Sequence, residues 1–287
     1  MYYRRLPKFE YLTPKSVEEA ASMLQKYGGD ARVTAGGTIV VHRMKERIGI
    51  RKYLIGLKSI PGLDHIDFDP STGLRIGAMA TLQSVADSPM VRDKYELLSV
   101  ACGKLGTPHI RNMGTLGGNV SCKLPAAETV PALIALGAEA ELVSTDGDRK
   151  VPIEDLNREL KQTDLLTEIS IPASSADKMW GYEKFAVRER LDYAVASAAV
   201  GILSGNGTWE KCRIALGGVP VKRAREAEHL LEGHTITDSL IEEAADRASQ
   251  RAKTRSDIEF SAEYKKTLLR VMVKRALKQA SGIRKVE

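Results

Sequence analysis

Two glycine-rich segments are the part of this 287-residue sequence whose residue types could do chemistry. Residues 35–38 read Ala-Gly-Gly-Thr, and residues 114–119 read Gly-Thr-Leu-Gly-Gly-Asn. Glycine tolerates positive φ and lets a ligand approach the backbone closely, and consecutive small residues can direct several N–H groups at one anion. One such segment would be weak evidence, since tight turns use the same residues. Two, with no Walker A lysine and no G-x-G-x-x-G motif, predict a diphosphate cofactor held outside a Rossmann fold.

The composition fits an ordinary globular protein with a mixed surface charge. Lysine and arginine number 43 against 37 acidic residues, for a formal net charge of +6, and aromatic residues make up 5%. Nucleic-acid binding favours clustered basic residues with interleaved aromatic ones. We therefore interpret the excess charge as a solvated basic surface and expect no nucleic-acid partner.

No segment predicts a membrane anchor or a secretion signal. No apolar run reaches the length of a membrane span, and residues 1–8 lack the apolar stretch of a signal peptide. Cys102, Cys122 and Cys212 are too few and too scattered for a disulfide framework or a four-cysteine metal site. These features predict a cytoplasmic protein.

The elements that must position the glycine segments begin with a small α/β unit. Ser16 and Glu19 form a capping box, an apolar helical face follows, and Gly28 ends the helix. Strands are expected over residues 32–35, which run into the first glycine segment, and over residues 52–57.

Residues 61–175 predict a second unit that mixes strands and helices. Asp146 and Gly147 form a typical hairpin turn inside it. The linker-like residues 173–177 end the unit. Its expected elements are strands at 66–68, 74–77, 138–143, 150–153 and 165–171 and helices from about 81 and over 94–105.

The C-terminal part predicts a third unit, an antiparallel three-stranded meander followed by three helices. The last helix is amphipathic, and its basic face could meet a membrane or nucleic acid, although helices normally turn their charges to solvent. The fold class is therefore α+β. The expected strands are 180–187, 194–203 and 211–216, and the expected helices are 221–231, 238–253 and 262–280.

Four stretches, in this order and spacing, resemble the FAD-binding medium subunit of the molybdenum hydroxylase family, the xanthine dehydrogenase and carbon monoxide dehydrogenase group. The resemblance covers nearly the whole chain. It implies a two-part FAD-binding domain of the PCMH or vanillyl-alcohol-oxidase type over residues 1–175, divided near residue 60, and a CO dehydrogenase flavoprotein-type domain over residues 178–287. The stretches are residues 33–45, 106–119, 125–131 and 213–219 with 223–228.

The resemblance also implies which residues bind FAD. Amides of the two loops would hold the diphosphate and neighbouring ribityl oxygens, and Leu105 and Ile169 would pack on the cofactor. Glu128 stands where the family has an aspartate that bonds it, Lys184 matches a lysine near the flavin end, and Tyr193 would lie near the isoalloxazine. The implied residues are Val33, Thr34, Ala35, Gly36, Gly37, Thr38, Ile39, Val40, Leu105, Thr115, Leu116, Gly117, Gly118, Asn119, Glu128, Ile169, Lys184 and Tyr193.

Two positions depart from the family pattern. Ile39 stands where a polar residue is common, so one polar contact to FAD would be missing, and Lys123 replaces a usual alanine and adds a charge near the cofactor. Neither change removes the amides. A valine at Gly117 is expected to block the diphosphate while leaving the fold intact.

Three tempting single residues have plainer interpretations. Cys122 is expected to be a small buried thiol rather than a redox group. His42 and His109 lack partners at ligand spacing and are expected to be packing or surface residues rather than metal ligands. No catalytic side chain is expected, because a flavin supplies the electron chemistry itself.

The resemblance implies an oxidoreductase subunit that passes electrons from the [2Fe–2S] clusters of a small partner subunit through FAD to NAD⁺, a quinone or another acceptor. A large subunit would carry the molybdopterin cofactor, in a heterotrimer or a dimer of heterotrimers. Two alternatives stay open. One is a stand-alone FAD-dependent reductase similar to the UDP-N-acetylenolpyruvoylglucosamine reductases, and the other is a basic binding protein whose glycine segments are ordinary turns.

Overall fold

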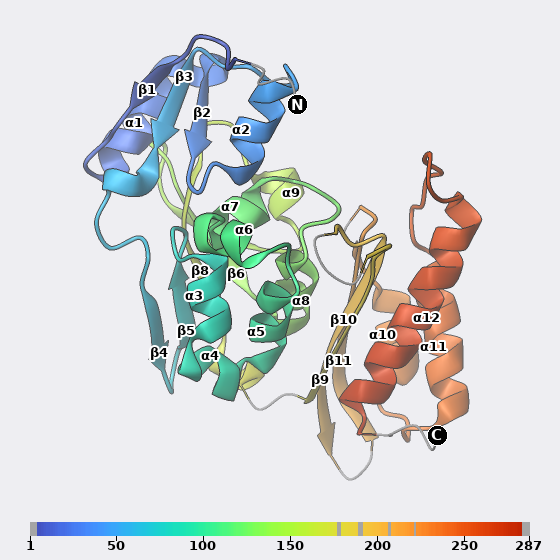
Figure 1. Ribbon diagram of the computed structural model, residues 1–287. Coiled ribbons are helices and arrows are strands. Elements are labelled where there is room, and N and C mark those ends of the chain that lie inside the picture. The colour runs from blue at the N-terminus through green and yellow to red at the C-terminus, as the bar shows by residue number, and fades with distance from the viewer. Residues whose placement is uncertain (1–4, 177–178, 189–191, 206–207, 221, 283–287) are drawn as a thin grey trace.

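Three sheets, each with its own helices, make up the protein (Figure 1). The computed structural model describes residues 5–176, 179–188, 192–205, 208–220 and 222–282. Mixed helices and sheets confirm the α+β class. Within the described residues, no helix is both long and apolar enough to cross a membrane.

The N-terminal subdomain is a parallel three-stranded sheet in the order β1-β3-β2. Ser16 caps α1 by accepting a hydrogen bond from the Glu19 amide at 3.2 Å, as the sequence predicted. The apolar face of α1 then packs on the sheet through Ala20 and Leu24. The sheet confirms the predicted α/β unit, and its short edge strand β1 was not predicted. The bounds are β1 (Glu10–Leu12), α1 (Val17–Tyr27), η1 (Gly28–Asp30), β2 (Ala31–Thr34), α2 (Thr38–Lys45), β3 (Tyr53–Gly56) and η2 (Leu57–Ser59).

The second subdomain is an antiparallel five-stranded sheet in the order β4-β5-β8-β6-β7, covered by short helices. All of its predicted strands are present. Four helices that follow the predicted helical region, α6 to α9, were not predicted, because each has only four to eight residues. The bounds are β4 (Ile66–Asp69), β5 (Gly73–Gly77), α3 (Leu82–Asp87), α4 (Pro89–Lys94), α5 (Glu96–Gly103), α6 (Pro108–Met113), α7 (Leu116–Ser121), α8 (Thr129–Leu136), β6 (Glu139–Val143), β7 (Arg149–Pro152), α9 (Leu156–Glu159), β8 (Leu165–Ile171) and η3 (Ala173–Ser175).

The C-terminal sheet has four strands, in the order β12-β11-β10-β9, and not the predicted three. Residues taken as the start of a helix form the two-residue strand β12, which pairs with Ala215 and Leu216 of β11, and α10 begins only at Arg225. Pairing with a neighbouring strand cannot be detected in two residues of sequence. The bounds are β9 (Met179–Phe185), β10 (Ala196–Gly205), β11 (Thr208–Gly217), β12 (Lys222–Arg223), α10 (Arg225–Leu231), α11 (Asp238–Gln250) and α12 (Ala262–Ala280).

The C-terminal sheet lies between two hydrophobic cores, as the view along its edge shows (Figure 1). Side chains alternate across a strand, so Ala198 and Val200 of β10 join the core with α10, α11 and α12, while Ala199 joins the core with α8. Glycine at position 201 lets β10 approach α8, because a Cβ there would lie 2.8 Å from the Ala135 carbonyl oxygen. The second and third units are therefore packed into one body.

Candidate functional site

The two glycine segments, about eighty residues apart in sequence, touch each other in the fold. A Cβ on Gly36 would lie 1.8 Å from the Met113 carbonyl oxygen, so only glycine permits this approach. Gly37 then adopts φ 73°, the left-handed conformation that glycine favours, and caps the start of α2. The glycines therefore hold the N-terminal subdomain against the second subdomain.

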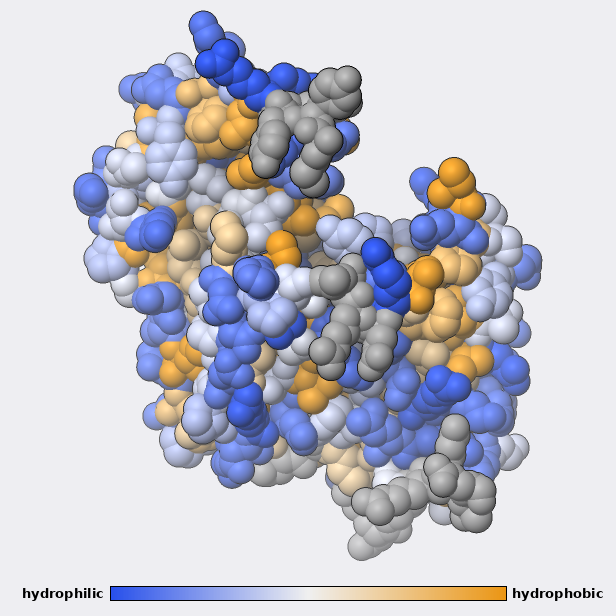
Figure 2. All heavy atoms as spheres, viewed as in Figure 1, coloured by the Kyte–Doolittle hydropathy of each residue, from blue (hydrophilic) through white to orange (hydrophobic). Residues whose placement is uncertain are grey.

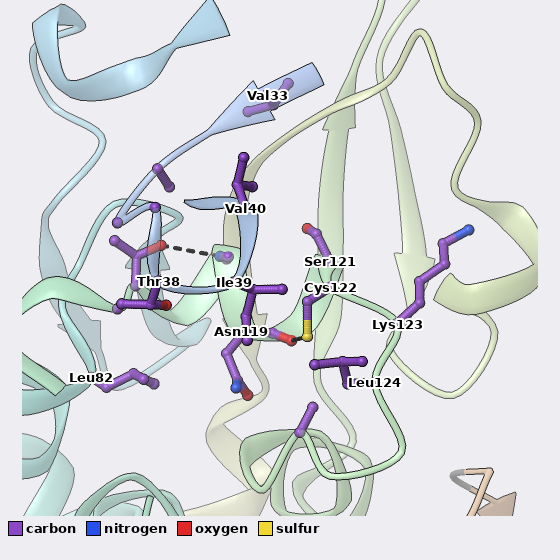
Figure 3. Close-up of a pocket in the computed structure, with 18 of the residues that line it drawn as sticks. Val33, Thr38, Ile39, Val40, Leu82, Asn119, Ser121, Cys122, Lys123 and Leu124 are labelled. Atoms are coloured by element: carbon purple, nitrogen blue, oxygen red, sulfur yellow. Dashed lines mark hydrogen bonds between the residues drawn. The ribbon is translucent and has the colours of Figure 1, made fainter. Parts of the chain in front are cut away.

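A cavity of about 610 Å³ opens where the two segments meet, a size within the range of roughly 300–1,000 Å³ that is usual for cofactor sites. In Figure 2 the surface dips between the N-terminal lobe and the upper end of the C-terminal helices. Figure 3 shows Ile39 and Val40, which follow the first segment, and Asn119 of the second segment together at the cavity. The predicted residues on its wall are Val33, Ala35, Gly36, Gly37, Thr38, Ile39, Val40, Leu105, Thr115, Gly117, Gly118, Asn119, Glu128 and Tyr193.

Four predicted residues do not line this cavity. Thr34 ends β2, where it pairs with Gly56, and Leu116 and Ile169 are fully buried in the core of the second subdomain. Lys184 lies behind the wall, in contact with Glu128. The structure therefore does not place these four side chains in contact with the cavity.

The first segment and the two residues after it carry a row of six consecutive amides without a protein acceptor in the part of the chain that the structure describes. Among the described residues, none of the N–H groups at positions 35–40 donates a hydrogen bond, and the next amide, Val41, donates to the Gly37 carbonyl. Residues 35–40 are half-buried, and N–H groups shielded from bulk water are nearly always paired in proteins. Unpaired amides at the start of the eight-residue helix α2, whose dipole adds positive potential, fit an anionic ligand group.

The second segment does not offer such a row, which differs from the sequence-based expectation. The amides of Leu116 and Gly117 donate to the carbonyls of Ala80 and Ala78 at 2.9 and 3.0 Å. The Gly118 amide donates to Thr115 Oγ1 at 3.1 Å and the Asn119 amide to the Thr115 carbonyl. These residues form α7, so the second segment presents Cα atoms and side chains to the cavity.

Gly117 also has a structural role that the sequence did not indicate. A Cβ at this position would lie 2.6 Å from Ala78 Cβ and 2.8 Å from the Ala78 carbonyl oxygen. Gly117→Val would therefore disturb the packing of α7 on the segment after β5, and the expectation of an intact fold was wrong. A ligand defect in this variant would not locate the diphosphate.

A buried ion pair lies behind the end of the cavity that Leu105 and Tyr193 line. Lys184 Nζ contacts Glu128 Oε1 at 2.9 Å, and the two side chains are 9% and 3% exposed. Lys184 also donates to the carbonyls of Lys104 and Asp192, at 3.1 and 2.9 Å. Burial raises the pKa of Glu128, while Lys184 opposes that rise. Tyr193 itself is 60% exposed at the cavity edge.

Two arginines that the sequence analysis did not single out line the cavity near the first segment. Arg32 precedes the segment on β2, and Arg43 lies four residues after Ile39, on the same face of α2. Neither side chain has a hydrogen-bond or ion-pair partner among the described residues. Burial and the charges of Arg51 and Arg43 lower the pKa of Arg32. The sequence could have indicated Arg43, because it lies four residues after Ile39 and so on the same face of the helix.

Lys123 adds less charge to the cavity than its position suggested. Its backbone has φ 53°, and Nζ donates to the carbonyls of Asn157 and Leu160 at the end of α9, at 3.1 and 3.3 Å. In Figure 3 the side chain points away from Ile39 and Val40. The ammonium group therefore binds the C-terminal carbonyls of a short helix.

The remaining single residues have structural surroundings. Cys122 is half-buried on the cavity wall, donates to the Asn119 carbonyl at 2.9 Å, and has a pKa raised by burial, as expected for an unreactive thiol. His42 and His109 are exposed on α2 and α6. Within the described residues, no cluster of side chains could hold a metal ion.

Comparison with known proteins covers nearly the whole chain. Residues 7–174 match the FAD binding domain in molybdopterin dehydrogenase, and residues 181–280 match the CO dehydrogenase flavoprotein C-terminal domain. The carbon monoxide dehydrogenase medium chain of Hydrogenophaga pseudoflava is 34% identical, over 96% of this chain and 97% of that one. The glyceraldehyde dehydrogenase medium chain of Sulfolobus acidocaldarius is 30% identical, over 96% and 99%.

Solved structures agree with the sequence relatives. A chain of the H. pseudoflava carbon monoxide dehydrogenase superposes with a TM-score of 0.92 at 35% identity, covering 96% of this chain and 98% of that one. A chain of quinoline 2-oxidoreductase from Pseudomonas putida 86 superposes with a TM-score of 0.88 at 29% identity, covering 97% and 99%. This chain belongs to the family of FAD-binding medium subunits of the molybdenum hydroxylases.

Proposed function

We propose that this chain is the flavin-carrying electron-transfer subunit of a molybdenum-containing dehydrogenase. The row of unpaired amides at residues 35–40 carries the proposal, since it opens onto a cavity of cofactor size inside the two matched domains. FAD, when bound, accepts and releases electrons one or two at a time. The protein's own contribution is to bind, orient and shield this group.

The roles of the wall residues follow from their surroundings. The amides of residues 35–40 and the N-terminus of α2 would bind the diphosphate, with positive charge added by Arg32 and Arg43. Leu105 and the backbone of Gly117 and Gly118 would pack on the cofactor. Tyr193, exposed at the cavity edge, would lie near the isoalloxazine, where it would control access to the flavin.

The finer architecture is also part of the proposal. We assign residues 1–175 to a two-part FAD-binding domain of the PCMH or vanillyl-alcohol-oxidase type, divided near residue 60, and residues 178–287 to the C-terminal domain. Separate sheets in the three units support these limits. The described cysteines are all free, which supports assembly in the reducing cytoplasm.

The partners follow from the relatives. Medium subunits that match along nearly this whole length belong to enzymes named carbon monoxide dehydrogenase, nicotine 6-hydroxylase and glyceraldehyde dehydrogenase. A small subunit with [2Fe–2S] clusters would deliver electrons to this chain, and a large molybdopterin subunit would hold the substrate, as a heterotrimer or a dimer of heterotrimers. Because the named substrates differ while this chain type persists, we place the choice of substrate on the large subunit. The electron acceptor, which is NAD⁺, a quinone or another molecule, would be selected at the flavin edge of this chain.

The proposal is tested by affinity purification of the tagged chain from its native cells. The eluate is assayed for its absorption spectrum and for flavin, iron and molybdenum. FAD with two co-purifying chains, iron and molybdenum supports the proposal. FAD on a lone chain indicates a stand-alone reductase instead, and an eluate without flavin contradicts the proposal altogether.

A further inference from the structure

The three polar contacts of Lys184 join three segments that surround one end of the cavity. Glu128 immediately precedes α8, Lys104 precedes the wall residue Leu105, and Asp192 precedes Tyr193. Glu128, Leu105, Asp192 and Tyr193 all line the cavity, whereas Lys184, on β9, does not. The lysine therefore holds the segments of this wall from behind.

The ammonium group is fully used by these contacts. Lys184 has three N–H donors, and the acceptors lie at 2.9, 3.1 and 2.9 Å. A buried ammonium group is costly unless it is paired and hydrogen-bonded. Here the pairing fixes two main-chain carbonyls that otherwise belong to loops, and burial at 9% exposure keeps water from competing for them.

The segment that carries Tyr193 has few other described anchors. The Asp192 carboxylate accepts hydrogen bonds from the amides of Arg188 and Tyr193, both at 3.0 Å, so these bonds are local to the segment. Arg188 also pairs with Asp192 at 3.6 Å, but that arginine is 69% exposed. An exposed ion pair contributes little. The Val195 amide donates to the Phe185 carbonyl at 2.9 Å, at the start of β10. Before that point, and among the described residues, the bond from Lys184 to the Asp192 carbonyl is the buried polar contact that ties the segment to the body of the protein.

We infer that Lys184 is a positioning residue for the mouth of the cofactor cavity. It holds the segment 192–195, which contains Tyr193, against residues 104–105 on the other side of the mouth. The inference rests on the proposed function, in which the cavity holds FAD and Tyr193 covers the flavin. Lys184 acts through the position of Tyr193 and makes no contact with the cofactor. Its effect is on access of solvent and electron acceptor to the flavin edge.

The test compares two variants that differ only at Lys184. Glu128→Gln keeps the ammonium group and its bonds to the Lys104 and Asp192 carbonyls, and the amide oxygen of the glutamine can replace the carboxylate as third acceptor. This variant is the reference, because it already contains the cost of the lost charge pair. Lys184→Met in the Glu128→Gln background removes both bonds without leaving an unpaired buried carboxylate, which avoids the largest cost of Lys184→Met alone. Hydrogen exchange of residues 192–195 reports opening of the segment, and iodide quenching of flavin fluorescence reports access to the cofactor.

Loss of two charge-assisted bonds is expected to speed exchange of residues 192–195 by roughly 10- to 100-fold relative to the reference variant. Iodide quenching is expected to rise in parallel. A third variant, Tyr193→Ala, should already show strong quenching, and adding Lys184→Met to it should change nothing further. Independent, additive effects of the two changes would overturn the inference.

The outcomes separate this inference from the proposed function. Hydrogen exchange is measured on the full chain both with and without FAD. The measurement without FAD tests the positioning role even if the chain does not bind the cofactor. Unchanged exchange in the Lys184→Met variant refutes the positioning role even if FAD binds tightly. Failure of the unmodified chain to bind FAD refutes the proposed function, whatever the exchange rates are.

Discussion

At the scale of single residues, two glycines of this protein allow one backbone segment to pack closely against another. Gly36 faces the Met113 carbonyl, and Gly117 faces Ala78. Both were interpreted from sequence as ligand-binding glycines, and both line the cavity, yet an added Cβ on either would meet protein. The unpaired amides are those of residues 35–40, around Gly36. Only the first segment therefore combines close backbone packing with amides that are free to bind a ligand.

Gly36→Ala is expected to force the two segments apart, because its Cβ would overlap the Met113 carbonyl oxygen. Overpacking of this kind typically costs about 1–3 kcal/mol of stability, and the displaced amides should lose most of their affinity for FAD. Thermal unfolding and FAD titration of the full chain measure the two effects. Gly103→Ala, at the end of α5 with no neighbour within 4 Å, is the control and should change neither.

Lys184→Met alone is expected to lower stability by about 3–5 kcal/mol near neutral pH, since it leaves Glu128 buried and unpaired. Without Lys184 the pKa of Glu128, already raised by burial, rises further. The native state then binds a proton that the unfolded state releases at about pH 4.5, so the deficit shrinks as pH falls. Urea unfolding at pH 8 and pH 5 measures this, and an equal deficit at both values would contradict it.

At the scale of elements, α2 and α7 differ although both follow a glycine segment. α2 follows a strand end and leaves its first amides unpaired, whereas α7 begins beside residues 78–80 and pairs its amides there. The same residue types therefore leave the amides unpaired at the start of α2, whereas at the start of α7 the amides are hydrogen-bonded within the protein. Sequence alone cannot separate the two, because the acceptors at Ala78 and Ala80 are almost forty residues away.

The Asp257 carboxylate is the main acceptor in the segment before α12, beside a bond from the Ala262 amide to Ser256 Oγ. Asp257 accepts hydrogen bonds from Lys265 and from the amides of Phe260 and Glu259, and the Lys265 bond is the main cause that lowers its pKa to about 2. A carboxyl with a lowered folded pKa stabilises the fold above its unfolded value of 3.8 and loses that effect as pH falls through about 2. The segment should therefore open between pH 4 and pH 2.

Pepsin cleavage near Phe260 measures this opening, because the ring is otherwise stacked on Tyr264 and packed edge-on against Phe185. Asp257→Asn should be cleaved readily at pH 4, where the unmodified chain resists. Asp148→Asn, in the exposed hairpin turn between β6 and β7, is the control and should behave as the unmodified chain. Equal resistance of all three proteins at pH 4 would contradict the role of Asp257.

At the scale of the whole molecule, the C-terminal sheet is shared by two cores, so the second and third units should unfold together. Gly201→Val would place a Cβ 2.8 Å from the Ala135 carbonyl oxygen and separate β10 from α8. We expect it to lower stability by about 1–3 kcal/mol while unfolding remains a single calorimetric transition. Two resolved transitions in the unmodified chain would show that the shared sheet does not couple the units.

The sequence by itself determined the elements with strong local signals and the family. The Ser16 cap, the hairpin at Asp146 and Gly147, and most strands were predicted because turns, caps and alternation are local properties. The order and spacing of four stretches, two of which contain the glycine segments, indicated the family, and the known relatives confirm it.

Only the tertiary structure decided which of those residues can meet a ligand. It paired the amides of α7 with residues 78–80, left those at residues 35–40 free, and placed Ile169 in the core. It brought Lys184 to Glu128 across 56 residues, and it added Arg32 and Arg43 to the cavity wall. These outcomes depend on which distant groups become neighbours, and a hydrogen bond or a close backbone approach of this kind has no signature in local sequence.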